Sequence, residues 1–318
     1  MRAAVCRALG PPEVVTVADV DAPTMVASGV RVRVRAGAVN YPDVLLVAGE
    51  YQLQVPPPFV AGSEFAGEVI EGDWARGDLV FGSTLVGAFA EEVVVAATSL
   101  TRVPDGIDCA TAAAFGVAHR TAYHVLRSVA ALKRGETVVV LGAGGGVGLA
   151  AVQLAAHLGA TVIAVASSAE KLAVARSLGA AHAVNHRDGD VRAALRAAAP
   201  EGADVVVDPV GGDLAEPALR SLRYGGRFVT VGYASGIIPR IPLNLVLLKG
   251  VEILGFQFAD FATHRSTERA RDDAELLELL RIGVARPHIG ARFALADVAA
   301  ALRYVADGRA VGKVVLEL

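Results

Sequence analysis

A run of apolar residues that ends in a cluster of glycines, VVVLGAGGGVG at residues 138–148, constrains the fold of this chain most strongly. It lies within residues 137–169, a segment with no Lys, Arg, Asp or Glu whose hydropathy alone is typical of a membrane span. Six glycines interrupt this segment, five of them between Gly142 and Gly148, and they disfavour a spanning helix. The pattern therefore predicts a buried strand, a glycine turn and a buried helix.

The residues after about Thr121 alternate between apolar strand patterns and helical patterns. The strands are expected at 136–141, 161–166, 203–207, 227–231 and 251–255, and helices at 148–158 and 171–178. Strands that are apolar throughout and alternate with helices are typical of a parallel sheet covered on both faces. We expect an α/β fold with a doubly wound sheet.

The first third of the chain is predicted to be rich in β-strands. Valines alternate with arginines over residues 30–34, and further short strands are expected at 68–70, 79–81 and 92–95. The prolines of residues 55–59 predict a rigid connector. Near the end, an amphipathic helix at 297–306 precedes a strand at 313–318.

Length and composition limit the class of protein. A chain of 318 residues is long enough for about two domains. Hydrophobic residues make up 53% of the chain but aromatic residues only 5%, so we expect a core built mainly from Ala, Val and Leu. The net charge of -3 without a basic stripe disfavours nucleic acid as a partner. Two cysteines cannot form a disulfide framework, and no signal peptide is evident, so a reducing cytoplasm is expected.

The glycine turn predicts a dinucleotide site. A strict G-x-G-x-x-G does not fit, because Val147 stands three positions after Gly144, but G-x-x-G-x-x-G fits at Gly142, Gly145 and Gly148. Backbone N–H groups there, including those of Gly146 and Val147, can reach a pyrophosphate at the positive end of the helix.

The end of the second strand favours NADPH over NADH. An NAD site would place a carboxylate about 20 residues after the glycine turn, where it accepts a hydrogen bond from the ribose 2′-hydroxyl. This chain instead has Ser167, Ser168 and Lys171 there, which could hold a 2′-phosphate. A structural alternative is compatible with this interpretation: Ser167 and Glu170 have the spacing of a capping box, and Lys171 could be solvated.

The chain resembles the zinc-free quinone oxidoreductases of the medium-chain dehydrogenase/reductase superfamily over nearly its whole length. The matching stretches are AGAVNYPD at 36–43, AGSEFAG at 61–67, AAAF at 112–115 with TAY at 121–123, the glycine turn, and GKVVL at 312–316. The resemblance implies a GroES-like β-barrel catalytic domain, residues 1–119 with 257–318, interrupted by a Rossmann domain, residues 120–256, with nicotinamide bound between them.

The resemblance also implies that no catalytic zinc is present. Zinc-dependent relatives use Cys, His and Cys, and the matching positions here are Asn40, Ser63 and Val117, none of which offers a thiolate or an imidazole. The structural zinc lobe is missing as well. Two pairs of histidines, His119 with His124 and His182 with His186, have no third metal ligand nearby. We expect these histidines at the surface or in the cleft.

Site residues follow from the same resemblance. Tyr51 matches a tyrosine that donates a proton or positions substrate in enoyl-thioester reductases, and Asn40 and Asp43 match positions near nicotinamide. Core packing for Tyr51 and a polar turn for Asn40 and Asp43 remain alternatives. Positions that match the family's cofactor cleft are Thr121, Asn185, His186, Val210, Gly232, Phe256 and Lys313. A solvated charge is an equal alternative for Lys313. Relatives often have a tyrosine at the position of His186.

These observations predict a metal-free reductase that transfers hydride from NADPH to a quinone or another activated conjugated carbonyl or alkene. An enoyl-thioester reductase is the close alternative. A non-catalytic NADPH-binding or RNA-binding protein is an alternative from another class, and NADPH oxidation on a quinone panel compared with filter binding discriminates it. A small-molecule substrate, no membrane partner and a homodimer through the sheet edge at 251–258 are expected.

Overall fold

The computed structural model describes all 318 residues, which form two compact units. The first unit comprises residues 1–117 and 287–318, and the second comprises residues 118–286. The chain therefore leaves the first unit and later returns to it. The return lies at residue 287 rather than at 257, because α8 and α9 belong to the second unit.

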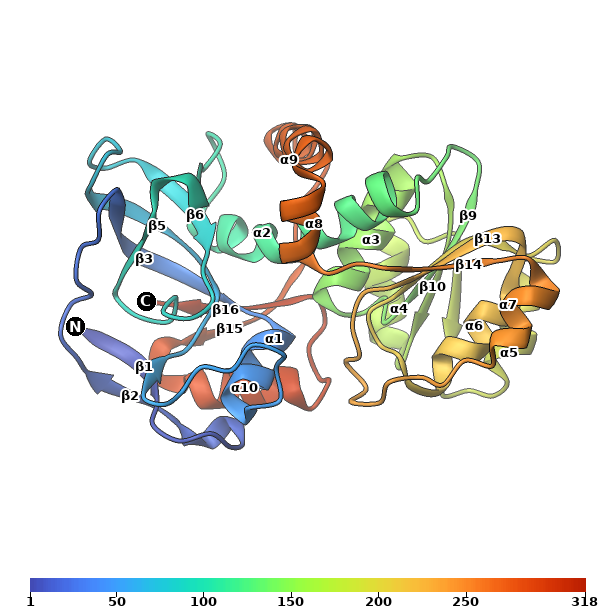
Figure 1. Cartoon of the computed structure of the whole chain (residues 1–318), viewed down its shortest axis with the longest axis horizontal. Helices are drawn as coiled ribbons and strands as arrows, with labels where there is room; N and C mark the ends of the chain where they lie inside the picture. The colour runs from blue at the N-terminus through green and yellow to red at the C-terminus, as the bar shows by residue number, and fades with distance from the viewer. The chain divides into compact units, whose positions relative to one another are not determined.

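The second unit is built on a six-stranded parallel sheet of order β11-β10-β9-β12-β13-β14 (Figure 1). Its strands are β9 (Thr137–Leu141), β10 (Thr161–Ala166), β11 (His182–Asn185), β12 (Ala203–Asp208), β13 (Leu222–Thr230) and β14 (Glu252–Gly255). The chain starts at the centre, moves to one edge and then crosses to the other, which is the Rossmann order. Val139 of the central strand pairs with Ile163 and Val206, all fully buried, so the predicted doubly wound sheet is confirmed.

Helices cover both faces of this sheet, with α3 and α4 on one face and α5 and α6 on the other (Figure 1). The helices of this unit are α3 (Gly146–His157), α4 (Ala169–Ser177), α5 (Val191–Ala198), the short η4 (Gly212–Leu214), α6 (Ala215–Ser221), α7 (Leu243–Lys249), α8 (Phe258–His264) and α9 (Ser266–Arg281). The charge-free segment is thus a strand, a turn and a twelve-residue helix. No helix in the structure is both long and apolar enough to cross a bilayer.

The first unit contains a seven-stranded sheet and a three-stranded sheet. The larger runs β15-β16-β3-β5-β6-β8, with β7 also paired to β3, and the smaller is β2-β1-β4. Its strands are β1 (Arg2–Cys6), β2 (Val15–Asp19), β3 (Gly29–Val39), β4 (Phe59–Val60), β5 (Glu64–Glu71), β6 (Leu79–Ser83), β7 (Glu92–Ala96), β8 (Leu100–Arg102), β15 (Ile289–Ala294) and β16 (Lys313–Glu317). Because β16 pairs with β3, the end of the chain completes the sheet begun by the first residues.

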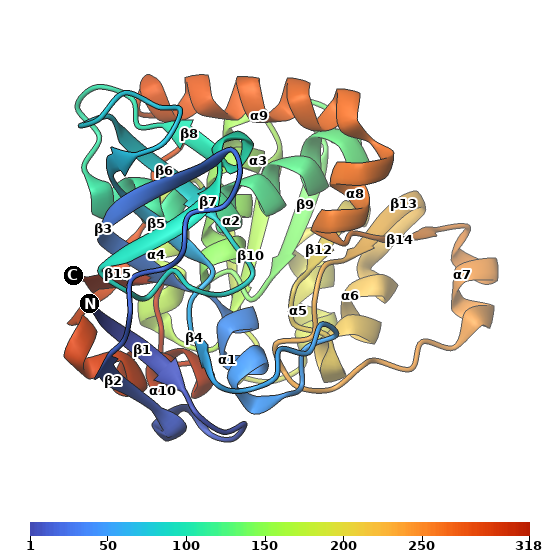
Figure 2. The ribbon, with the colours of Figure 1, turned by 60° about the vertical axis from the view of Figure 1, so that its left-hand side comes forward.

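Helices accompany these sheets, and one of them, α2, continues into the second unit. They are α1 (Tyr41–Ala48), α2 (Cys109–His124) with the π-helix η3 (Val125–Val129), α10 (Val298–Ala306), and the short η1 (Pro12–Val14), η2 (Ala97–Ser99) and η5 (Leu295–Asp297). Helix α1 lies beside α10 (Figure 2).

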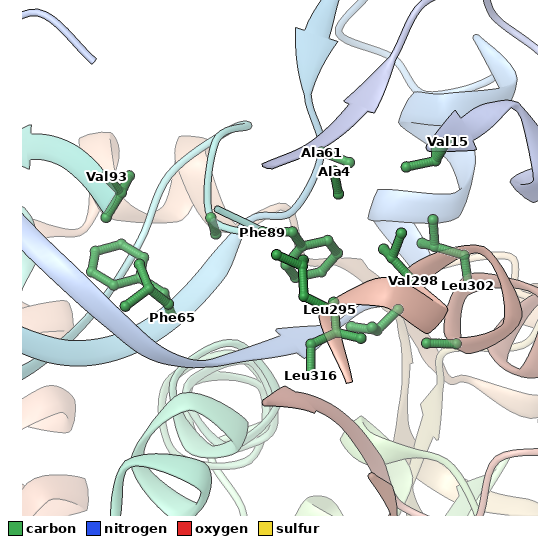
Figure 3. Packing of buried hydrophobic residues seen from close by; sticks show 14 of the residues in the cluster. Ala4, Val15, Ala61, Phe65, Phe89, Val93, Leu295, Val298, Leu302 and Leu316 are labelled. Carbon is green, nitrogen blue, oxygen red and sulfur yellow. The ribbon is translucent and has the colours of Figure 1, made fainter. Parts of the chain in front are cut away.

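Buried aromatic and aliphatic side chains hold the first unit together (Figure 3). Phe65 and Phe89 are fully buried, and Leu302 from α10 packs in the same cluster as Ala4 from β1. The ring of Phe89 lies against Gly62, whose φ of 95° also favours glycine. Replacing a buried phenylalanine by alanine typically costs about 3–5 kcal/mol, so this cluster is a main source of stability for the unit.

Candidate functional site

The glycine turn between β9 and α3 has the geometry that an anion site needs. Gly142 adopts φ of 61°, and a Cβ at Gly148 would collide with the carbonyl oxygen of Gly142. Gly145 precedes α3 without any side-chain cap, so the first N–H groups of the helix, at Gly146, Val147 and Gly148, have no side-chain acceptor. These N–H groups and the positive end of the helix fit a pyrophosphate.

The end of β10 places polar and basic groups beside this turn. Ser168, rather than Ser167, is the N-cap of α4, since its hydroxyl accepts the N–H of Lys171 at 3.3 Å. The alternative of a capping box at Ser167 is therefore wrong. Ser167 is left to accept from Lys171 Nζ at 3.5 Å. The aliphatic stem of Lys171 lies over Gly144, where any Cβ would collide with it.

Lys171 is therefore half-buried, and the alternative of a fully solvated lysine is wrong. Burial, followed by the charge of Arg187, lowers the pKa of Lys171, and burial together with Arg187 also lowers the pKa of His186. Neighbouring cations attract a phosphate and form charge-assisted hydrogen bonds with its oxygens. Ser167, Lys171 and Arg187 thus fit the 2′-phosphate of NADPH.

The remaining candidates in the second unit follow the carboxyl ends of the sheet strands, with the exception of Thr121 on α2. Asn185 ends β11, and its side chain accepts the N–H of Arg187 at 3.1 Å. Val210 follows β12 and lies against Gly142, and Gly232 follows β13. Phe256 follows β14, where its ring packs against His124, Phe258 and Phe261. Ligands of open parallel sheets bind at this edge.

The first unit contains a buried network around Glu64. Lys313 Nζ donates to Asn40 Oδ1 at 2.6 Å and to Glu64 Oε2 at 3.0 Å. Asn40 Nδ2 donates to Glu64 Oε2 at 3.0 Å and to the Ala38 carbonyl at 3.2 Å. Glu64 Oε1 accepts the Val117 N–H at 2.6 Å. Lys313 is only 4% exposed, so the solvated alternative is wrong, and both charges of the pair are compensated inside the protein.

Asp43 and Tyr51 lie next to this network. Asp43 is 1% exposed, and its Oδ2 accepts the Asn40 backbone N–H at 2.7 Å, while its Oδ1 makes no hydrogen bond of good geometry. Burial raises the pKa of Asp43 to about 6, although Ser63 and the Asn40 N–H oppose the rise. Burial and the charge of Asp43 raise the pKa of Tyr51, so its phenol keeps its proton at neutral pH.

The residues at the expected metal positions do not fit a catalytic zinc. Both amide hydrogens of Asn40 are donated within the protein, Ser63 offers a hydroxyl, and Val117 offers a backbone N–H that Glu64 already accepts. No group of three His, Cys, Asp or Glu side chains in the structure could hold a metal ion. Neutral amides and hydroxyls are weak partners for zinc compared with thiolate and imidazole.

The expectation that His119 and His124 lie at the surface or in the cleft is wrong. His119 is 2% exposed and shares a hydrogen bond with Gln153 at 3.2 Å. His124 is fully buried, with Nδ1 3.1 Å from Asp272 and Nε2 3.4 Å from Asp273. Burial lowers the pKa of His124, but the two carboxylates together outweigh it and raise the pKa above its ordinary value. The contacts of His124 join α2 to α9 within the second unit.

Three residues of these sites were not predicted from the sequence: Glu64, Arg187 and Asp208. Asp208 is fully buried at the end of β12, and its Oδ1 accepts the N–H groups of Val210 and Gly211, both at 2.8 Å. It shapes the turn that carries Val210. In the sequence Glu64 directly follows Ser63, which matches a metal position, and Arg187 directly follows the candidate His186. Their position next to a candidate residue is the one sequence feature that could have indicated them.

Two family models match the chain. Residues 27–105 match the alcohol dehydrogenase GroES-like domain, and residues 146–275 match the model described as zinc-binding dehydrogenase. A GroES-like domain combined with a Rossmann sheet of this order defines the medium-chain dehydrogenase/reductase superfamily. The second model is named for zinc, which the residues at Asn40, Ser63 and Val117 do not fit.

Comparison with individual proteins narrows the class. The chain is 36% identical to quinone oxidoreductase-like protein 2 of Bos taurus over 100% of this chain and 92% of that protein. It is 33% identical to the solved quinone oxidoreductase of Thermus thermophilus, with a TM-score of 0.87 over 100% of both chains, and that protein was also solved with NADPH. The Escherichia coli quinone oxidoreductase complexed with NADPH is 26% identical, with a TM-score of 0.90 over 100% of both chains. The chain belongs to the quinone oxidoreductase family.

Proposed function

We propose that this protein is an NADPH-dependent reductase that transfers hydride to a quinone or another activated conjugated carbonyl or alkene, without a catalytic metal. The observation that carries the proposal is the Asn40, Glu64 and Lys313 network, which uses the polar atoms of the expected metal position inside the protein. The NADPH complexes of the Thermus and Escherichia relatives support the coenzyme.

The residues of the second unit bind and orient the coenzyme in this proposal. The N–H groups that begin α3 hold the pyrophosphate, and Ser167, Lys171 and Arg187 hold the 2′-phosphate. When bound, NADPH supplies a hydride from C4 of its nicotinamide. Further predicted contacts of this unit along the coenzyme are Thr121, Asn185, His186, Val210, Gly232 and Phe256. Lys313 of the first unit also remains a predicted contact.

The residues of the first unit favour an acceptor that is already electron-poor. Polarising a simple alcohol or ketone usually needs a Lewis acid, which the residues at Asn40, Ser63 and Val117 do not hold. A quinone or a conjugated carbonyl delocalises the charge that develops on hydride addition, so hydrogen-bond donors suffice. The Tyr51 phenol keeps its proton at neutral pH and can donate a hydrogen bond or a proton to the reduced acceptor.

The coenzyme assignment is tested by Lys171→Ala, with Lys133→Ala as the matched control because Lys133 is an exposed lysine of the same unit. A charge-assisted hydrogen bond contributes about 1.5–3 kcal/mol, so we expect the Kd for NADPH to rise roughly 10-fold to 100-fold while the Kd for NADH is unchanged. Equal losses for NADPH and NADH, or a preference of the unmodified protein for NADH, would overturn the assignment.

The role of Tyr51 is tested by Tyr51→Phe on the best acceptor of a quinone and enone panel. Removing a proton or hydrogen-bond donor from the transition state lowers kcat by about 10-fold or more. An unchanged kcat would show that the phenol only packs. The unmodified protein binding NADPH tightly but turning over no acceptor would instead support the non-catalytic alternative.

An enoyl thioester is the second candidate substrate. The chain is 37% identical over 90% of its length to a segment that makes up 5% of the polyketide synthase GfsB of Streptomyces halstedii. This similarity favours including a short enoyl thioester on the panel. A kcat/KM on the enoyl thioester that exceeds every quinone by tenfold would make it the preferred assignment.

We further propose that the protein is a homodimer formed through the β14 edge of the second unit. Strand β14 pairs only with β13, and apolar side chains near this edge are exposed: Tyr224 by 86%, Leu247 by 80% and Leu248 by 75%. Apolar exposure of this kind is typical of an interface. Light scattering should give a dimer that Leu247→Lys converts to a monomer.

Both cysteines are free, which is compatible with the cytoplasmic location we propose.

A further inference from the structure

A pocket outside the proposed coenzyme site lies in the second unit, beside the ends of α5 and α6. Its volume is about 820 Å³, within the range of about 300–1,000 Å³ of small-molecule sites. The start of α5, the residues from Gly212 to Arg220 and the segment 237–241 form its walls. The connection between β13 and α7, which carries that segment, runs past α5 and α6 (Figure 2). None of the residues assigned above to the coenzyme lines this pocket.

Backbone hydrogen bonds fix the wall of the pocket that the segment 237–241 forms. Gly212 N donates to the carbonyl of Ile237 at 2.9 Å, and Ser235 N donates to the carbonyl of Val210 at 3.0 Å. Gly212 has φ of 60°, and a Cβ there would lie 2.8 Å from the Ser235 hydroxyl. The connection is therefore held against the turn after β12, and the pocket is a formed feature of the fold.

Three arginines and three carboxylates line this pocket, and Asp190 among the carboxylates is already engaged as the N-cap of α5, where it accepts the backbone N–H groups of Arg192 and Ala193. Arg192, Arg220 and Arg240 line it, and of these only Arg220 has an ion pair, with Glu216 at 2.7 Å. Burial, followed by the charges of Arg192, Arg196 and Arg220, lowers the pKa of nearby Lys249. Guanidinium groups match phosphate oxygens in two-pronged hydrogen bonds.

The segment 237–241, which carries Arg240, also contributes apolar side chains to the pocket. Ile237 is 56% exposed and Ile238 is 69% exposed, which leaves apolar surface facing solvent. Asp213 also lines the pocket and makes no hydrogen bond or ion pair within the protein, so its carboxylate is free to accept from a hydroxyl.

We propose that this pocket binds an organic phosphate of the nucleotide class, with its phosphate at Arg192, Arg220 and Arg240 and its flat apolar part on Ile237 and Ile238. The proposal does not depend on the reductase activity, because none of the predicted catalytic or coenzyme residues takes part. A phosphate joined to a flat base occurs both in a free adenine nucleotide and in the phosphorylated ADP group of coenzyme A.

The experiment is calorimetric titration of the full chain, kept saturated with NADPH, with ADP, coenzyme A, dephospho-coenzyme A and inorganic pyrophosphate. The test variant is Arg192→Ala/Arg240→Ala, because neither side chain has an ion pair whose loss would disturb the fold. Arg196→Ala is the matched control, since Arg196 is an exposed arginine of the same helix that does not line the pocket.

We expect ADP or coenzyme A to bind in the presence of NADPH, and the double variant to weaken that binding at least tenfold while Arg196→Ala and the Kd for NADPH stay unchanged. A coenzyme A preference that is lost with dephospho-coenzyme A identifies the coenzyme A group, and equal binding of ADP identifies the free nucleotide. No binding of either, binding only in the absence of NADPH, an equal loss in Arg196→Ala, or pyrophosphate binding as tightly as ADP would overturn the proposal.

Discussion

Replacing Lys313 by methionine is predicted to destabilise the first unit strongly. The ammonium is 4% exposed and donates to Asn40 Oδ1 and Glu64 Oε2, so its loss leaves a fully buried carboxylate with only the Asn40 amide and the Val117 N–H as donors. Removing one partner of a buried ion pair costs about 3–5 kcal/mol, and we expect that loss in the free energy of unfolding.

The assay is urea unfolding followed by tryptophan fluorescence. Trp74 is the single tryptophan and belongs to the first unit, so its signal reports the unit that contains the network. Arg303→Met is the matched control, because Arg303 pairs with Glu13 at the surface and its removal should leave the urea midpoint nearly unchanged.

A double variant separates the ion pair from simple loss of packing. In Lys313→Met/Glu64→Gln the uncompensated charge is gone, so the loss should be smaller than the sum of the two single losses by about 1–3 kcal/mol. A loss below about 1 kcal/mol in Lys313→Met, or additive losses in the double variant, would show that the buried ion pair does not stabilise this unit.

Three further predictions follow from individual contacts. In Gly148→Ala the new Cβ would collide with the Gly142 carbonyl, so this variant should have a lower melting temperature and should not bind NADPH. In Gly145→Ala the nearest atom is 3.6 Å away, so the melting temperature should be unchanged and only NADPH binding should weaken. Equal melting temperatures for the two variants would contradict this prediction. Asp43 has a folded pKa of about 6 above its ordinary 3.8, so the stability it contributes is present below pH 3.8 and is lost as the pH rises through 6. Asp43→Asn should therefore remove a pH dependence of about 3 kcal/mol in urea unfolding between pH 4 and pH 8, and an unchanged slope would argue against it. His124 has a raised folded pKa, so its contribution is present below pH 6.5 and is lost as the pH rises through the folded value. His124→Gln should consequently cost more stability at pH 6 than at pH 9 in thermal melts, and an equal cost at both values would show that its charge is not stabilising.

The parts of the fold that local pattern determines were predictable from the sequence. The strand, turn and helix at 137–157 follow from unbroken apolar residues and from glycines that only a tight turn requires. The strand at 313–318 follows from its apolar pattern as well, whereas the return of the chain to the first unit follows from the family resemblance, and β16 pairs with β3 as that resemblance implies.

The buried ionic contacts could not be predicted in the same way. Glu64 and Lys313 are 249 residues apart, and His124 and Asp272 are 148 apart, so each pair depends on tertiary packing that no local pattern encodes. The choice of Ser168 over Ser167 as N-cap rests on where β10 ends, a boundary that the sequence leaves open by one residue.

Hydride transfer without a catalytic metal is tested by the rate of NADPH oxidation with the best quinone before and after exhaustive treatment with a metal chelator, with zinc then added back. Because Asn40, Ser63 and Val117 offer no ligand set for zinc, we expect the same kcat/KM in all three states. A rate that falls on chelation and returns with zinc would show that the reaction depends on a metal.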